Sequence, residues 1–320
     1  MKVLITGGAG FIGSYLSEAY LERNCEVYVI DDLSTGRLEN IKHLLKNPSF
    51  HFVNDTILNR EVMLELTGIC DIVVHLAAAV GVKLIIDEPL KSIHTNIAGT
   101  EMVLELANKF RKKTFLASTS EVYGRNSKVP LSEDDERVYG STAVARWSYA
   151  ATKATDEFLA LAYYRNKQLP VIVARFFNTV GPRQTGRYGM VVPRFVGQAL
   201  RNEPLTIYGT GTQTRTFTYV GDVVQAVMAL IDEPHAVGEI FNVGGDEEIS
   251  IIDLASRVKS LTGSSSPIEH IPYERAYQEG FEDMERRVPD ISKLKRTVGY
   301  TNTHNLDAML VKIIEHERTR

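Results

Sequence analysis

The chain has 320 residues, of which 44% are hydrophobic and 24% charged, an ordinary composition for a globular protein. A formal net charge of −4 lacks the basic excess of nucleic-acid-binding proteins, so we expect no nucleic-acid partner. No apolar run approaches the roughly 18 residues of a membrane span, so we expect no membrane partner either. Two distant cysteines, Cys25 and Cys70, and an N-terminus without a signal-peptide pattern indicate reduced thiols in a cytoplasmic protein.

The first half of the chain alternates short apolar segments with longer amphipathic ones. We predict strands at Lys2–Thr6, Glu26–Ile30, Phe50–Val53, Asp71–His75, Thr114–Ser118 and Pro170–Arg175. We predict helices between them at Phe11–Arg23, Pro89–Phe110 and Trp147–Lys167. Strand–helix alternation predicts an α/β fold, a Rossmann-type doubly wound parallel sheet. Its strands are apolar without alternation, as expected when helices cover both faces of the sheet.

After about Gly181 this rhythm ends, and Gly, Pro, Arg and Thr concentrate in residues 181–189 and 208–216. Predicted helices return at Val192–Arg201, Asp222–Ile231, Ser250–Leu261 and Asn305–Glu317. We therefore expect a cofactor-binding domain over residues 1–178 and a smaller α+β, substrate-binding lobe over residues 179–320. A stretch near residues 210–245 is expected to return to the first domain.

A glycine loop, TGGAGFIG, joins the first strand to the first helix. Gly7 would make the tight turn, Gly10 would let the backbone approach a pyrophosphate, and Gly13 would let helix and strand pack closely. Free N–H groups at the helix N-terminus favour a phosphate. The strand–loop–helix setting makes this a dinucleotide-binding pattern rather than a chance set of glycines.

Acidic and small residues end the next strands. Asp31 ends the second strand, where a carboxylate binds adenosine ribose hydroxyls and favours NAD over NADP. Asp55 ends the third strand and Ala77–Ala78 the fourth, which places them on the adenine and pyrophosphate side. Asp55 alone could equally cap a helix.

Tyr149 and Lys153 are spaced i,i+4 in a predicted helix and so share one face. A buried ammonium beside a phenol is expected to lower the pKa of the tyrosine and make it a usable base. The pattern alone is common by chance. Ser118, Thr119 and Ser120 end the fifth strand, at the edge where doubly wound sheets bind ligands. One of these hydroxyls could hold a reacting oxygen or merely cap a turn.

Taken together, these motifs resemble the extended short-chain dehydrogenase/reductase family of nucleotide-sugar epimerases, dehydratases and decarboxylases. The resemblance covers nearly the whole chain. It rests on TGGAGFIGS (6–14), HLAA (75–78), STSEVYG (118–124), YAATK (149–153), RFFNTVGPR (175–183), YGTGTQTRTFTYVGD (208–222) and NVGG (242–245).

The resemblance assigns a role to each candidate residue. Tyr149 would take the proton of the sugar 4-hydroxyl as hydride passes to tightly held NAD, while Lys153 tunes Tyr149 and contacts the nicotinamide ribose. Thr119, with Ser120 beside it, would bind the 4-oxygen. Further implied NAD contacts are Phe11, Ile12, Asp32, Thr56, Leu76, Asn96 and Ser118. Implied nucleotide-sugar contacts are Glu121, Asn178, Val192, Tyr208, Arg215 and Arg287.

Glu121, which comes directly after the hydroxyls, is the residue that best indicates which reaction the chain catalyses. Many 4-epimerases have no acid here, and dTDP-glucose 4,6-dehydratases have an Asp where this chain has Ser120. An acid in this setting resembles UDP-glucuronate decarboxylases and also GDP-mannose 4,6-dehydratases, which usually prefer the NADP that Asp31 opposes. The stretch from Arg146 to Tyr149 and the Arg287-x-Pro element also resemble decarboxylases, which makes Glu121 and Arg287 candidate catalytic residues.

One departure favours an epimerase: residues 79–84 lack the Pro-x-x-Tyr element usual in decarboxylases. We therefore predict a UDP-glucuronate decarboxylase, with a UDP-hexose or UDP-hexuronate 4-epimerase as the alternative. A 4,6-dehydratase and a non-catalytic NAD-binding protein rank below both. No metal site is expected. The predicted helices 89–110 and 147–167 match those that form the dimer interface in similar proteins, so we also expect a homodimer.

Overall fold

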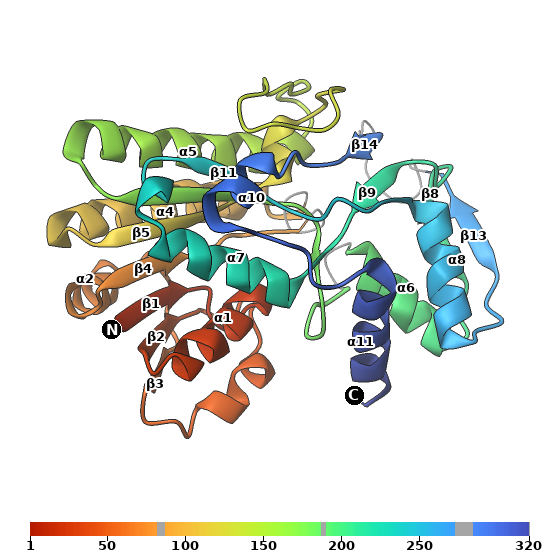
Figure 1. The fold of residues 1–320 in the computed structure, drawn as a ribbon, viewed down its shortest axis with the longest axis horizontal. Coiled ribbons are helices and arrows are strands. Elements are labelled where there is room, and N and C mark those ends of the chain that lie inside the picture. The colour runs from red at the N-terminus through yellow and green to blue at the C-terminus, as the bar shows by residue number, and fades with distance from the viewer. Residues whose placement is uncertain (82–86, 187–189, 273–283, 320) are drawn as a thin grey trace.

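The centre of the molecule is a seven-stranded sheet in which every pairing is parallel. Figure 1 shows this sheet with helices packed against it. The structure is a computed structural model that describes residues 1–81, 87–186, 190–272 and 284–319. In sheet order the strands are β11 (Ile240–Val243), β6 (Val171–Phe176), β5 (Lys113–Thr119), β4 (Ile72–His75), β1 (Lys2–Thr6), β2 (Glu26–Ile30) and β3 (Phe50–Val53). The predicted Rossmann-type fold is confirmed.

Helices cover both faces of this sheet. One face carries α1 (Phe11–Glu22), α7 (Val220–Asp232) and α10 (Ser292–Val298), which share one apolar core with the strands. The other carries α2 (Arg60–Ile69), α4 (Pro89–Phe110) and α5 (Arg146–Lys167). Burial on both faces explains why the strand residues Val73 and Val74 are both apolar, with 0% of either exposed.

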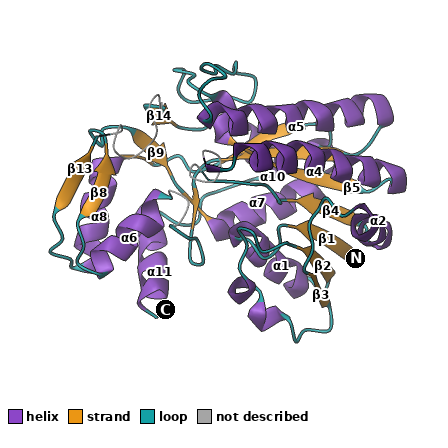
Figure 2. Ribbon diagram, turned by 180° about the vertical axis from the view of Figure 1, so that it is seen from behind, coloured by secondary structure: helices purple, strands orange, loops and turns teal. Residues whose placement is uncertain are grey.

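A smaller lobe lies beside the carboxyl ends of the strands (Figures 1 and 2). Its helices α6 (Val191–Leu200), α8 (Ile251–Thr262) and α11 (Leu306–Arg318) pack around a separate apolar core. Its short strands are β7 (Thr179–Val180), β8 (Leu205–Tyr208), β9 (Thr214–Thr216), β10 (Thr218–Tyr219), β12 (Glu248–Ser250), β13 (Ile268–Ile271) and β14 (Arg286–Arg287). Side-chain caps start two of the helices, because Ser250 accepts from the Asp253 N–H and Asn305 from the Ala308 N–H.

The chain passes between these two parts more than once. Strand β11 pairs with β6 at the edge of the large sheet although α6 and the strands β7 to β10 of the small lobe come before it in sequence. Strand β14 then pairs with β9 and returns the chain to the small lobe, which places Arg287 beside Arg215 in the register. Residues from distant parts of the sequence therefore meet where the two parts face each other.

None of the helices within the described ranges combines the length and the apolar character needed to cross a membrane. Cys25 and Cys70 are both free, as expected for reduced thiols, and both are buried.

Candidate active site

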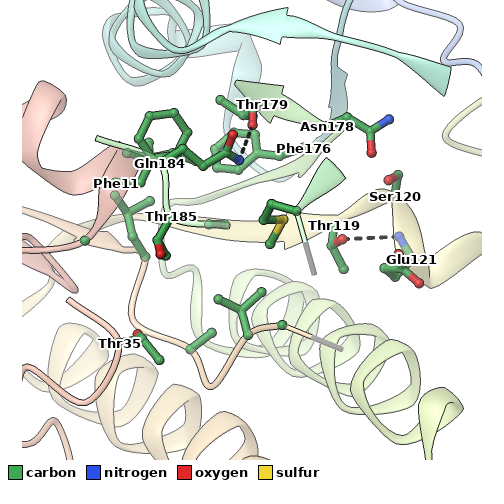
Figure 3. Close-up of a pocket in the computed structure, with 18 of the residues that line it drawn as sticks. Phe11, Thr35, Thr119, Ser120, Glu121, Phe176, Asn178, Thr179, Gln184 and Thr185 are labelled. Atoms are coloured by element: carbon green, nitrogen blue, oxygen red, sulfur yellow. Dashed lines mark hydrogen bonds between the residues drawn. The ribbon is translucent and has the colours of Figure 1, made fainter. Parts of the chain in front are cut away.

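A cavity of about 470 Å³ runs along the carboxyl edge of the sheet, and a neighbouring cavity of about 280 Å³ shares Gly7, Asp31 and Ala77 with it. Strand β1 lies between β4 and β2, so the chain winds in opposite directions on its two sides. This change of direction is the place where doubly wound sheets bind ligands. Figure 3 shows Phe11 and Thr35 towards one end of the larger cavity and Thr119 and Glu121 towards the other.

The glycine loop is shaped so that backbone can approach a ligand. Gly7 has φ +71°, and a Cβ there would lie 2.8 Å from the backbone nitrogen of Ala77. A Cβ on Gly13 would lie 2.4 Å from the Gly7 carbonyl oxygen, so only glycine allows α1 to start this close to the loop. Gly10 precedes α1, and no side chain in the described residues caps that helix. Its N-terminal N–H groups suit a phosphate.

Asp31 is fixed beside this loop. Its carboxylate accepts the Ala9 N–H at 3.0 Å and the Leu33 N–H at 2.9 Å. Burial raises the pKa of Asp31, and these backbone donors oppose the rise. The carboxylate therefore lies where it can meet the ribose of a dinucleotide. Together with the glycine cradle, this arrangement fits NAD.

Most of the residues that the motifs assigned to NAD line one or both cavities. The larger cavity is lined by Gly7, Gly10, Phe11, Ile12, Gly13, Asp31, Leu76, Ala77, Ala78, Ser118, Tyr149 and Lys153. The smaller is lined by Gly7, Asp31, Asp32, Asp55, Thr56, Ala77 and Ala78. Asp55 accepts from the Thr56 N–H and from the Asn59 side chain, while Asn59 itself caps α2. The helix-cap alternative for Asp55 is therefore wrong.

Two predicted contact residues lie outside the cavity linings. Asn96 is buried behind the loop after β4, where its Oδ1 accepts the Ala79 N–H at 2.8 Å, so it supports that loop. Val192, the second residue of α6, is buried in the apolar core of the small lobe. Its neighbours Met190 and Val191 line the cavity instead. Ser118 does line the cavity, yet its hydroxyl donates to Glu157 at 2.5 Å.

Tyr149 and Lys153 lie in the first turns of α5, with 8% and 3% of their surfaces exposed. The ammonium of Lys153 donates to Asp156 at 2.9 Å. Burial raises the pKa of Tyr149, the negative charges of Glu121 and Asp156 raise it further, and a hydrogen bond with Thr119 lowers it. The expected lowering of the Tyr149 pKa is therefore wrong: burial and these two negative charges outweigh the favourable contact, and the Lys153 ammonium is engaged by Asp156.

Glu121 lies in a short 3-10 turn, η3 (Ser120–Tyr123), whose start is fixed by the Thr119 hydroxyl accepting the Glu121 N–H (Figure 3). One carboxylate oxygen is 2.6 Å from Arg287 Nη1, and the other is 3.4 Å from Arg146 Nη2. Burial raises the pKa of Glu121, but the two guanidinium groups lower it more, to about 2. Glu121 is therefore an anion at neutral pH, so it cannot donate a proton there.

The small lobe closes the other side of the cavity. Asn178 and Tyr208 line it, and the guanidinium of Arg194 stacks 4.2 Å from the Tyr208 ring centroid. The guanidinium of Arg215 donates to the carbonyl oxygens of Thr214 and Met284 and contributes to the low pKa of Glu121. This end therefore combines stacking surface with positive charge, which suits a nucleotide diphosphate.

Three side chains to which the motifs assigned no role lie in the site or beside it. Arg146 and Arg194 line the cavity, and Asp156 holds Lys153. Arg146 and Asp156 both lie one helical turn from the Tyr149–Lys153 pair, at i−3 and i+3, and this spacing was the available signal. No comparable pattern in the sequence indicates Arg194. Within the described residues, no group of three or more His, Cys, Asp or Glu side chains could hold a metal ion.

Relatives of known function share this chain's sequence over most of its length. UDP-N-acetyl-alpha-D-glucosaminuronate decarboxylase of Bacillus cytotoxicus is 45% identical and matches 92% of this chain and 90% of its own length. UDP-glucuronic acid decarboxylase 1 of Arabidopsis thaliana is 37% identical over 100% of this chain and 70% of its own.

The fold also matches solved structures. UDP-glucuronic acid 4-epimerase from Bacillus cereus, solved with UDP-glucuronic acid and NAD, superposes with a TM-score of 0.90 at 33% identity, covering 100% of this chain and 99% of the other. The family described as GDP-mannose 4,6 dehydratase matches residues 4–313. With nearly the whole chain matched and the glycine loop and Tyr149–Lys153 pair in one cavity, this protein belongs to that family.

Proposed function

We propose that the protein decarboxylates a UDP-linked hexuronic acid through a 4-keto intermediate, with NAD as its cofactor. The observation that carries this proposal is Glu121 between Arg287 and Arg146 in the cavity that also holds Tyr149. Guanidinium groups bind carboxylates in a fork geometry, and a hexuronic acid brings a carboxylate that a neutral hexose lacks. The two decarboxylases, at 45% and 37% identity, support the same reaction.

The first step oxidises C4 of the sugar. Tyr149 accepts the proton of the 4-hydroxyl as the C4–H bond breaks, and Thr119 donates a hydrogen bond to the same oxygen. When bound against the glycine loop and Asp31, NAD would supply the hydride acceptor for C4 and the hydride donor for the reverse transfer. Lys153 lies one turn along α5, where its ammonium can hold the nicotinamide ribose and stabilise negative charge on Tyr149.

The second step breaks the C5–C6 bond. The C4 ketone is β to the C6 carboxylate, so CO₂ leaves and the electron pair moves through C5 and C4 onto the ketone oxygen. Thr119 and protonated Tyr149 donate hydrogen bonds to this enolate, which carries the charge that develops in the transition state. A proton from water then adds at C5, and Tyr149 gives its proton back to the 4-oxygen as C4 is reduced again. The product is a UDP-pentose.

Arg287 and Arg146 orient the sugar carboxylate in this scheme, and Glu121 holds the two guanidinium groups in place. Because Glu121 is ionised, its negative charge also disfavours a bound carboxylate and favours neutral CO₂. This effect is in the direction that decarboxylation requires.

A second candidate is 4-epimerisation of the same substrate. The Bacillus cereus epimerase binds UDP-glucuronic acid and has 33% identity with this chain. Part of the segment that resembles epimerases, residues 79–84, lies outside the described residues, so it does not separate the two reactions. Both reactions share the oxidation at C4 and differ in the steps after it.

Mass spectrometry of the products separates the candidates. We would incubate the protein and NAD separately with UDP-glucuronate, UDP-N-acetylglucosaminuronate and UDP-glucose. Loss of CO₂ from either uronate is the expected result. A product of unchanged mass at a new retention time would identify a 4-epimerase and contradict decarboxylation. Tyr149→Phe controls for a contaminating activity, because this variant should still bind NAD but form neither the decarboxylated product nor the isomer of unchanged mass.

We also propose a homodimer built on α4 and α5, in the cytoplasm. Leu90 and Phe158 lie on these adjacent helices with 83% and 65% of their surfaces exposed, which supports an apolar contact. Leu104 and Leu106, in contrast, are fully buried in the chain's own core. The buried free thiols of Cys25 and Cys70 fit a reducing compartment. Light scattering tests the dimer: Phe158→Glu should give a monomer, and a monomeric wild-type protein at micromolar concentration would contradict it.

A further inference from the structure

The ammonium of Lys153 has a buried anionic partner that the Tyr-Lys motif does not include. Asp156 lies one helical turn further along α5, and its Oδ2 accepts from Lys153 Nζ at 2.9 Å. The two side chains are 3% and 1% exposed. Within the described residues this is the hydrogen bond that the ammonium makes. The charge that should support Tyr149 is therefore shared with a carboxylate.

Asp156 is an unfavourable residue for this place on structural grounds. Burial raises the pKa of its carboxyl group, and Lys153 together with a hydrogen bond from Thr100 only partly opposes the rise. Its Oδ1 accepts no hydrogen bond from any described residue. Burying a charge with an unsatisfied oxygen destabilises a fold, and a small neutral side chain would avoid this. The contact with Lys153 is what the carboxylate contributes.

The other groups that face Tyr149 are neutral or have their charge opposed by a guanidinium group, so Asp156 can control the charge around the phenol. Glu121 approaches the phenol from η3, but its charge is already opposed by Arg287. Thr119 faces it from β5 and is neutral. His75 on β4 is neutral as well, because burial and the charge of Lys153 lower its pKa to about 3.

The next acid along α5, Glu157, is occupied elsewhere. It is paired with Arg175 at 2.7 Å and Arg137 at 2.9 Å. Asp156, in contrast, acts on both members of the Tyr149–Lys153 pair, because it binds the ammonium and places negative charge near the phenol.

We propose that Asp156 is a positioning residue that fixes the place of the Lys153 ammonium and thereby sets the pH range in which Tyr149 accepts the substrate proton. The inference rests on the proposed oxidation at C4. The proposal predicts the direction in which the pH dependence of Tyr149 changes when Asp156 is replaced. Removing the carboxylate removes a charge that disfavours the phenolate and releases the ammonium towards it, so Tyr149 should work as a base at lower pH.

The test is the pH dependence of hydride transfer in a single turnover, read from the absorbance of the reduced nicotinamide. Wild-type protein with NAD would be mixed with UDP-glucuronate, UDP-N-acetylglucosaminuronate or UDP-glucose. Asp156→Asn is the main variant, and Asp156→Ser is a second neutral variant in case the first does not fold. Asp232→Asn is the matched control, because it makes the same change at an exposed carboxylate, 56% exposed, that pairs with Arg23 on the surface.

We expect the acidic limb of the profile to move down by about one pH unit in both Asp156 variants and to stay in place in Asp232→Asn. An unchanged limb, or one moved upwards, in folded Asp156 variants would overturn the inference and leave the proposed function intact. Hydride transfer without CO₂ release would remove only the decarboxylation step, and the Asp156 variants would still be compared with wild type. Absence of hydride transfer in the wild type would overturn both.

Discussion

Two carboxylates beside Tyr149 act on its phenol, and their environments shift their own pKa values in opposite directions. Glu121 is held by Arg287 and Arg146, and despite burial its pKa is lowered to about 2. Asp156 is paired with the ammonium of Lys153 and receives a hydrogen bond from Thr100, and its pKa is raised because burial outweighs both. Loss of solvent penalises the charged form of both acids, so the difference in pKa comes from the cationic partners: two guanidinium groups for Glu121 and one ammonium for Asp156.

A third acid obeys the same rule. Glu157 is 1% exposed, yet its pKa is lowered, because Arg175 and Arg137 pair with it and Ser118 donates to it. Glu157 ties β5 and β6 to α5 and thus supports the helix that carries Tyr149. The number of donors around a buried acid therefore separates firmly ionised carboxylates from the poorly satisfied Asp156.

The largest expected effect comes from removing the group on which both carboxylates act. Tyr149→Phe should lower turnover roughly a thousandfold, because it removes the hydroxyl that accepts the substrate proton in the proposed scheme. NAD affinity, measured by fluorescence titration, should change little. Retained turnover in a folded Tyr149→Phe protein would show that another group acts as the base.

The next effect separates the two arginines of Glu121. Arg287→Met should lower the rate of CO₂ release about a hundredfold, because Arg287 makes the 2.6 Å contact. Arg146→Met should lower it only about tenfold, because its contact is 3.4 Å. Hydride transfer to NAD should be less affected in both. A larger loss for Arg146→Met would reverse this assignment.

The low pKa of Glu121 has a consequence for stability. Its folded pKa of about 2 lies below the unfolded value of 4.5, so its ionisation stabilises the fold above about pH 5, and this is lost as pH falls towards about 2. Over this pH range the free energy of unfolding of the wild type should fall by roughly 3 kcal/mol more than that of Glu121→Gln. Urea unfolding at a series of pH values measures both.

Glu248 provides a matched control for that measurement. Arg286 lowers its pKa to about 2 as well, but this pair lies at the surface, with the arginine side chain 54% exposed. Solvent screens such pairs, so Glu248→Gln should change the pH dependence of unfolding by less than about 1 kcal/mol. Equal effects for the two variants would show that burial does not strengthen the Glu121 pairing.

The smallest effect concerns Asp31, whose partners are backbone N–H groups rather than cations. Asp31→Asn should weaken NAD binding about tenfold, because the amide is a poorer acceptor for ribose hydroxyls. NADP binding should weaken less, because the like charge facing a 2′-phosphate is removed. Calorimetric titration with both dinucleotides measures the ratio of the NAD affinity to the NADP affinity. A ratio unchanged from wild type would show that Asp31 does not determine which dinucleotide binds.

The sequence by itself determined the layers of the fold and the chemistry of the loops. Apolar runs without alternation marked the strands β1 to β6, and their alternation with amphipathic segments required helices on both faces. The glycine loop was readable because only glycine tolerates the φ of Gly7 and the close approach at Gly13. Tyr149 and Lys153 were readable because helical spacing alone places them on one face.

Only the tertiary structure decided which charges meet. Sequence spacing shows that Asp156 can reach Lys153, but burial decides that the pair excludes water. Arg287 reaches Glu121 because β14 pairs with β9 far along the chain, and no local pattern contains that register. Asn96 and Val192 do not line the cavity, because packing between elements sets which side of a helix faces the ligand. A pKa depends on these through-space neighbours, so the direction for Tyr149 could not be obtained from its motif.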